Sequence, residues 1–142
     1  MSLDVWLEPP EGQKAFLVNN ELLVLSKTDW IDLYDGLKDE YVKIEFTNEL
    51  YSANITHNLN QMATQAGIYV YLWTPEQVPV KRAEEMIGPL ENGLALLRSS
   101  PGFYKTFEAA NGWGNYGDFL PWVDRYLQAC KQFPYASVHA SR

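Results

Sequence analysis

The chain has 142 residues, of which 46% are hydrophobic and 14% aromatic, so it can bury a core and is not generally disordered. Its formal net charge of −7 disfavours binding to duplex nucleic acid, which depends on Lys and Arg at the phosphates. The apolar runs are too short to span a bilayer, and the single cysteine, Cys130, excludes an intramolecular disulfide and a cysteine-based metal site. We expect one domain over residues 1–142, cytoplasmic, with no membrane partner, metal or other cofactor.

The N-terminal third of the sequence predicts strands. Residues 4–8 alternate around Val5 and Leu7, which indicates an opening strand, and the Pro-Pro-Glu-Gly run at 9–12 ends it. The apolar runs 15–18 and 21–25 flank Asn19-Asn20, and asparagine tolerates the positive φ angles of a tight hairpin turn.

A short helix and a further strand are predicted next. Thr28 is expected to cap a helix that carries Trp30 and ends near Gly36. Residues 41–47 then alternate, with Val42, Ile44 and Phe46 on one face, as in a half-buried strand.

The second half of the chain predicts helices. One apolar stripe at steps of three and four indicates a helix capped by Asn54: Ile55, Leu59, Met62, Ala66, Tyr69 and Trp73. A second stripe runs from Ala83 to Leu97, and Pro89 predicts a kink or break near Gly88.

The C-terminal part completes an α+β fold. A short helix is expected from Ser100 to Phe107, and Asp118 is expected to cap a last helix that Phe133-Pro134 ends. Residues 136–140 predict a strand that pairs with the first one. We therefore expect one small antiparallel sheet, from the N-terminal strands and this C-terminal strand, covered by about four helices.

Four polar side chains form the first half of a candidate binding site. On the predicted helix, positions 54, 57, 58 and 61 share one side, and these are Asn54, His57, Asn58 and Gln61. Three amides and an imidazole offer convergent hydrogen-bond donors and acceptors. The plainer interpretation is a capping asparagine, a histidine bonded to a backbone carbonyl, and amides that face water.

The loop at residues 111–117 forms the second half of the candidate site. Gly112 and Gly114 let backbone N–H groups approach a ligand, and the following helix N-terminus favours an anion. Trp113 and Tyr116 can stack on a base or a sugar. The plainer interpretation is a tight turn after a helix, with Trp113 packed into the core.

Several motifs in the sequence resemble a family of small, uncharacterised phage and bacterial proteins. They are the Ala-Asn-Ile-Thr-His-Asn-Leu segment at 53–59, the Asn-Gly-Trp-Gly-x-Tyr loop at 111–116, and shorter matches in the first eight residues and at 62–73, 90–94 and 126–130. The resemblance covers most of the chain from Asn54 onward, and residues 9–47 match poorly. It implies a phage or prophage source, hence the host cytoplasm, and no established activity.

The sequence favours non-catalytic binding of a small nucleotide-like ligand. By analogy with other small phage proteins, such a binder would sequester a nucleotide signal of host defence. The first alternative is a small hydrolase or lyase with His57 as general acid–base, although no metal-ligand spacing or nucleophile motif accompanies that histidine. The second is an acidic protein that inhibits a host factor. The oligomeric state stays open, with a homo-oligomer as one possibility.

Overall fold

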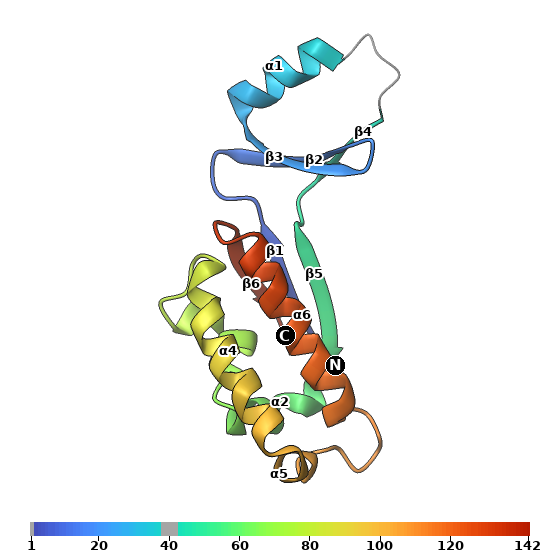
Figure 1. The fold of residues 1–142 in the computed structure, drawn as a ribbon, viewed down its shortest axis with the longest axis vertical. Coiled ribbons are helices and arrows are strands. Elements are labelled where there is room, and N and C mark those ends of the chain that lie inside the picture. Colours follow the sequence, from blue (N-terminus) through green and yellow to red (C-terminus); the bar gives the residue numbers. More distant parts are fainter. Residues whose placement is uncertain (1, 38–42) are drawn as a thin grey trace.

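The computed structural model describes residues 2–37 and 43–142 and confirms the α+β class (Figure 1). Two three-stranded antiparallel sheets and six α-helices are present in these ranges. None of the helices in the described ranges is both long and apolar enough to cross a membrane.

The main sheet has the first strand at its centre. β1 (Ser2–Glu8) pairs antiparallel with β5 (Tyr51–Thr56) on one side and with β6 (Ser137–Ser141) on the other. The alternation of β1 sends Leu3, Val5 and Leu7 into the core, where they are buried. The opening strand and its pairing with a C-terminal strand are both confirmed.

Helices cover one face of the main sheet (Figure 1). The long helices α4 (Glu84–Ser99) and α6 (Tyr116–Gln132) pack side by side across it. The shorter ones are α2 (Asn60–Gln65), α3 (Tyr69–Trp73), α5 (Pro101–Lys105) and the 3-10 turns η1 (His57–Leu59) and η2 (Pro75–Gln77). Together with the sheet they enclose one apolar core, to which the stripe of α6 contributes Phe119, Val123 and Cys130.

A small lobe, made of residues 13–37 and 43–47, is inserted between β1 and β5 and lies beyond the end of the main sheet (Figure 1). It contains the small sheet of β2 (Gln13–Val18), β3 (Glu21–Ser26) and β4 (Ile44–Thr47), with α1 (Lys27–Leu37) on one face. The hairpin is confirmed, since Asn19 and Asn20 have φ of 49° and 68°.

The strands therefore divide between two sheets, where the sequence predicted one. The break at residues 9–12 turns the chain out of the main sheet, so β2 pairs only with its neighbours β3 and β4. The strand predicted over residues 41–47 is present over Ile44–Thr47, and positions 41 and 42 of that prediction lie outside the described residues.

The single helix predicted from Asn54 to Trp73 is wrong. Asn54 does not cap a helix, because it lies inside β5, opposite Asp4 of β1. Apolar and polar residues also alternate over 51–56, as in a strand. Pairing with β1 favours this two-residue period over the helical one. Helical structure begins at His57, and α2 ends before Gly67, whose φ of 75° is left-handed.

Two predicted caps and one predicted break also need correction. Ser26, not Thr28, caps α1, since its Oγ accepts the N–H of Asp29. Asn115, not Asp118, caps α6. α4 runs unbroken through Pro89, which lies in its second turn and removes only one helical hydrogen bond, while the apolar stripe on both sides packs into the core.

Candidate functional site

The two polar segments singled out in the sequence meet in the structure. The Asn58 Nδ2 donates a hydrogen bond to the backbone carbonyl of Trp113, at 3.0 Å. Gly114 packs against the same turn, since a Cβ built on it would lie 3.1 Å from Thr56 Cγ2 and 3.4 Å from Asn58 Cβ. Its φ of 115° also favours glycine. The 111–114 loop is therefore seated directly on the end of β5.

A pocket of about 590 Å³ opens between these segments. We call it the polar pocket, and its lining is Ser2, Asn54, Thr56, His57, Asn58, Asn111 and Trp113. Over the part of the chain that the structure describes, the lining includes hydroxyls, amides and one imidazole, but no Asp, Glu, Lys or Arg. The Trp113 side chain is 70% exposed, so the interpretation of this residue as a core plug is wrong.

His57 is held by a buried tryptophan. The indole Nε1 of Trp73 donates to His57 Nδ1 at 3.1 Å, and the two rings meet edge to face at 5.9 Å. An indole N–H can only donate, so His57 Nδ1 carries a lone pair and the neutral ring bears its proton on Nε2. This contact fixes the tautomer of the only imidazole in the pocket lining.

Asn54 lies on the outer face of the main sheet, which the helices do not cover. Its Nδ2 donates to the Asp4 carboxylate at 2.7 Å, and its backbone carbonyl accepts from Trp122 Nε1 at 3.1 Å. The first contact orients the amide, leaving its Oδ1 as an acceptor. The second satisfies a carbonyl at the open edge of β5.

Four of the predicted site residues do not line the polar pocket: Gln61, Gly112, Gly114 and Tyr116. Gln61 is exposed on α2. Gly112 shapes the turn, with its N–H bonded to the Ala109 carbonyl at 3.1 Å. Tyr116 is buried, and its hydroxyl donates to the Leu97 carbonyl at 2.6 Å, so its ring belongs to the core.

The N-terminus of α6, expected to favour an anion, is already occupied by the chain itself. Asn115 Oδ1 accepts the Asp118 N–H at 2.8 Å, and Glu108 Oε1 accepts the Tyr116 N–H at 3.0 Å. The carboxylates of Glu108 and Asp118 at this end complement the helix dipole. A ligand phosphate would meet these negative charges, so this helix end is not an anion site.

Three further residues of the polar pocket were not among the predicted contact residues, namely Ser2, Thr56 and Asn111, although Thr56 and Asn111 lie within the two predicted segments. Ser2 and Thr56 are cross-strand partners, and the alternation of β1 and β5 places both on the outer face. Had 51–56 been read as a strand, the set Ser52, Asn54 and Thr56 would have been recognised as one polar face.

The outer face also carries a group that resembles a catalytic triad in composition. Glu8 Oε2 lies 2.9 Å from His139 Nε2, and Ser137 Oγ lies 3.0 Å from the same nitrogen. A Ser-His-acid triad needs the carboxylate and the hydroxyl on opposite ring nitrogens. Here both contact Nε2, while the ring stacks on Trp6 at 5.4 Å, so the arrangement is structural.

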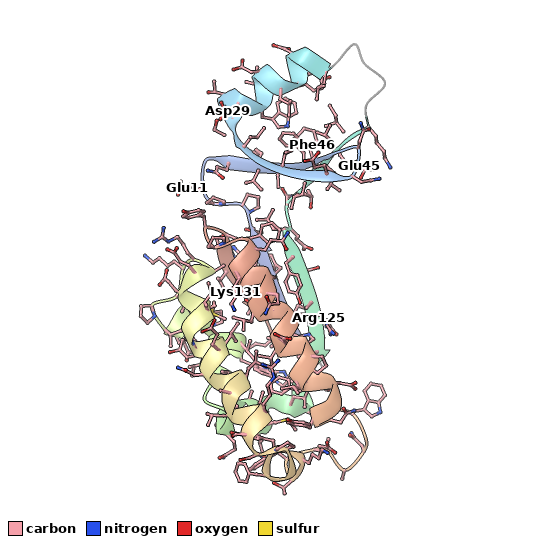
Figure 2. All side chains as sticks on the ribbon, in the orientation of Figure 1. Glu11, Asp29, Glu45, Phe46, Arg125 and Lys131 are labelled. Carbon is pink, nitrogen blue, oxygen red and sulfur yellow. The ribbon has the colours of Figure 1, made fainter. Side chains whose placement is uncertain are left out.

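A smaller pocket of about 370 Å³ adjoins the polar pocket and shares Asn54 and Thr56 with it. It contains the side chains of Arg125 and Asp118. Figure 2 shows Arg125 on α6, on the side of the helix nearer β5. Over residues 2–37 and 43–142, no three His, Cys, Asp or Glu side chains are grouped so that they could hold a metal ion.

Comparison of the chain with protein-family models, with curated proteins and with solved structures finds no match. The function is therefore inferred from the geometry and chemistry of the sites themselves.

Proposed function

We propose that this protein binds a small nucleotide-like ligand without catalysing a reaction, and that it holds the ligand in the polar pocket. The observation that carries the proposal is the hydrogen bond from Asn58 to the Trp113 carbonyl. It brings an exposed indole next to a wall of amides and hydroxyls. A flat π-surface beside such a wall suits a planar base attached to a sugar.

The ligand is recognised mainly through its uncharged parts. Asn58 and Asn111 offer amide groups to base edges, and Ser2 and Thr56 offer hydroxyls to a sugar. Among the described residues, the lining has no cationic side chain, so phosphate groups are not the primary contact. A phosphate attached to the ligand would reach Arg125 only by extending into the adjoining pocket.

Binding is favoured over turnover by the state of His57. A general base needs a free lone pair, but Nδ1 already accepts from Trp73 and Nε2 bears the proton. A neutral imidazole N–H is a weak acid but a good hydrogen-bond donor. His57 is therefore suited to hold a ligand acceptor rather than to transfer a proton.

The resemblance to phage proteins makes an anti-defence role the specific form of this proposal. Such a protein would act in the host cytoplasm by sequestering a nucleotide signal. The binding site and the biological role are separate claims, since the pocket chemistry supports only the first.

The test is incubation with a panel of nucleosides and nucleotides, followed by native mass spectrometry and calorimetry. We expect intact ligand to be recovered, and Trp113→Ala to weaken binding by about 1–3 kcal/mol, the range for base–aromatic stacking. Stability of this variant should change by less than about 0.5 kcal/mol, because the side chain is exposed.

Tyr135→Ala is the matched control, since Tyr135 is 65% exposed in the turn before β6 and lies outside the pocket lining. Equal loss of affinity in both variants would remove Trp113 from the site. Recovery of a chemically altered ligand, with turnover lost in His57→Gln, would establish the enzyme alternative instead.

A further inference from the structure

The small lobe contains a second cavity, unrelated to the polar pocket. It has a volume of about 500 Å³ and is lined by Lys14, Ala15, Lys27, Trp30, Ile31, Phe46, Thr47 and Asn48. We call it the aromatic groove. Figure 2 shows Phe46 in this lobe, between the small sheet and α1. None of the lining residues belongs to the polar pocket, so the groove can be tested separately.

Stacked rings form the apolar part of the groove. Trp30 stacks on Phe46 with centroids 5.3 Å apart and on Tyr34 at 5.0 Å, and Phe16 meets its edge at 5.8 Å. Phe16 is buried, whereas the Phe46 side chain is 68% exposed. The buried ring of Phe16 thus supports the stack, and the ring of Phe46 is open to solvent. Such a surface can stack on a planar molecule at little cost in side-chain entropy.

The polar part of the groove is positively charged. Lys14 and Lys27 line it, and neither ammonium group makes an ion pair or hydrogen bond with the described residues. No carboxylate of residues 2–37 or 43–142 belongs to the lining. By contrast, Lys43 in the same lobe is paired with Glu45 at 2.9 Å. Two unpaired cations in one groove are notable in a chain whose net charge is −7.

A ring that lines the groove also carries an unsatisfied donor. Trp30 Nε1 is the one side-chain nitrogen or oxygen in the described residues that is shielded from solvent and lacks a hydrogen-bond partner. A buried polar group without a partner is uncommon in folded proteins, and it costs stability. This observation is independent of the lysines and falls on the same residue that forms the ring stack.

We propose that the aromatic groove is a binding site for a small planar aromatic anion. Its ring stacks on Phe46 and Trp30, and its acidic group is held by Lys14 and Lys27. The combination of an apolar cavity with a few convergent charges is typical of small-molecule sites. Charge complementarity selects an anion over a neutral or cationic aromatic.

The test uses two fluorescent probes that differ in charge. 8-Anilinonaphthalene-1-sulfonate is an aromatic anion with a planar naphthalene ring, and N-phenyl-1-naphthylamine has the same rings without the sulfonate. We expect one sulfonate probe per chain, bound about tenfold more tightly than the neutral probe at low ionic strength. The Lys14→Gln/Lys27→Gln variant should bind both probes about equally, and Phe46→Ala should weaken both.

Matched controls separate this groove from other surfaces. Phe103→Ala removes a 50% exposed ring on α5, and Lys81→Gln/Lys105→Gln removes two charges outside the groove. Both should retain the preference for the sulfonate. Circular dichroism checks the fold of each variant. If Phe46→Ala unfolds the lobe, the Lys14→Gln/Lys27→Gln variant still tests the proposal, because it leaves the apolar packing of the groove intact.

Equal affinity of the wild type for the two probes would overturn the proposal, as would binding that neither groove variant changes. Self-association in sedimentation that Phe46→Ala abolishes, without any preference for the sulfonate, would assign the groove to a second copy of the chain instead.

Discussion

The amide of Asn58 holds the backbone carbonyl of Trp113 at 3.0 Å and so joins two segments that are 55 residues apart. Gly114 packs against the same turn with a positive φ, so a larger residue there would be strained and tightly packed. The position of the exposed indole is thus set by a contact that does not involve the indole itself.

Asn58→Ala should release this loop without unfolding the protein. We expect backbone amides of residues 111–114 to exchange faster with deuterium, measured by mass spectrometry, while the rest of the chain is unchanged. The loss of stability should be about 1 kcal/mol or less, because water can replace the lost bond at this exposed site. Gln61→Ala removes an exposed amide from the neighbouring helix and should alter neither quantity. Faster exchange in both variants would contradict the role of Asn58.

His57 and Trp73 should be coupled in stability. His57→Ala leaves the buried indole N–H of Trp73 without an acceptor, which costs about 1–3 kcal/mol. His57→Gln offers a carbonyl oxygen in its place and should recover at least part of that loss. Urea denaturation of the two variants measures the difference, and equal destabilisation would show that the hydrogen bond contributes nothing.

Gly93 in α4 is required by packing, not by backbone conformation. A Cβ at this position would collide with Cγ2 of the buried Ile68, so Gly93→Ala should cost about 1–3 kcal/mol through overpacking. Gly102 of α5 faces open space and has an ordinary φ. Gly102→Ala should therefore stabilise the fold by about 0.4–1 kcal/mol. Thermal and chemical denaturation of the pair decides the point, and a neutral Gly93→Ala would show that Ile68 moves aside freely.

Stability should fall in alkaline solution because of Cys130. Burial raises the pKa of its thiol from 9.0 to about 12, so between these values the unfolded chain has released a proton that the folded chain retains. The unfolded state then binds fewer protons, and stability decreases with rising pH by up to about 1.4 kcal/mol per pH unit.

Cys130→Ala should reduce this slope in chemical denaturation measured from pH about 8 to about 11. Part of the slope should remain, because burial also raises the pKa values of Tyr126 and Tyr51. The native thiol should resist alkylation at pH about 8 and react after unfolding. An unchanged slope in the variant would show that the thiol does not titrate differently in the two states.

The parts of the fold that could be predicted are those with one clear period. β1 alternates cleanly, the Asn19-Asn20 turn has a specific backbone requirement, and α6 carries a strong apolar stripe. Residues 54–73 could not be assigned in this way. Ile55 fits both a helical stripe and an alternating strand, and only the pairing with β1 decides between them.

The candidate site was predictable in composition but not in detail. Asn58 and Trp113 were expected to belong together, yet nothing local indicates that one would bind the backbone of the other. Tyr116 belongs to the same motif as Trp113, but it is the first residue of α6 and lies on the side of that helix that faces the core. Its ring is therefore buried and does not reach the pocket. Which side of a helix a residue occupies depends on where the helix begins. The sequence places the cap at Asp118, three residues after the true cap Asn115, so it leaves Tyr116 outside the helix.

The insertion of the small lobe into the β1–β5 pair has a consequence for how the chain can change. Leu7 and Tyr51 face each other across the main sheet, and the Leu50 N–H bonds to the Leu7 carbonyl at 2.8 Å, so the lobe leaves and returns at almost the same point. A short turn could close the same pair. Because the entropy of loop closure grows only slowly with length, by about 0.6 kcal/mol per doubling, we expect the main sheet to tolerate either version. We therefore expect that the lobe, and the aromatic groove with it, can be replaced or removed as a unit while the rest of the chain keeps its fold.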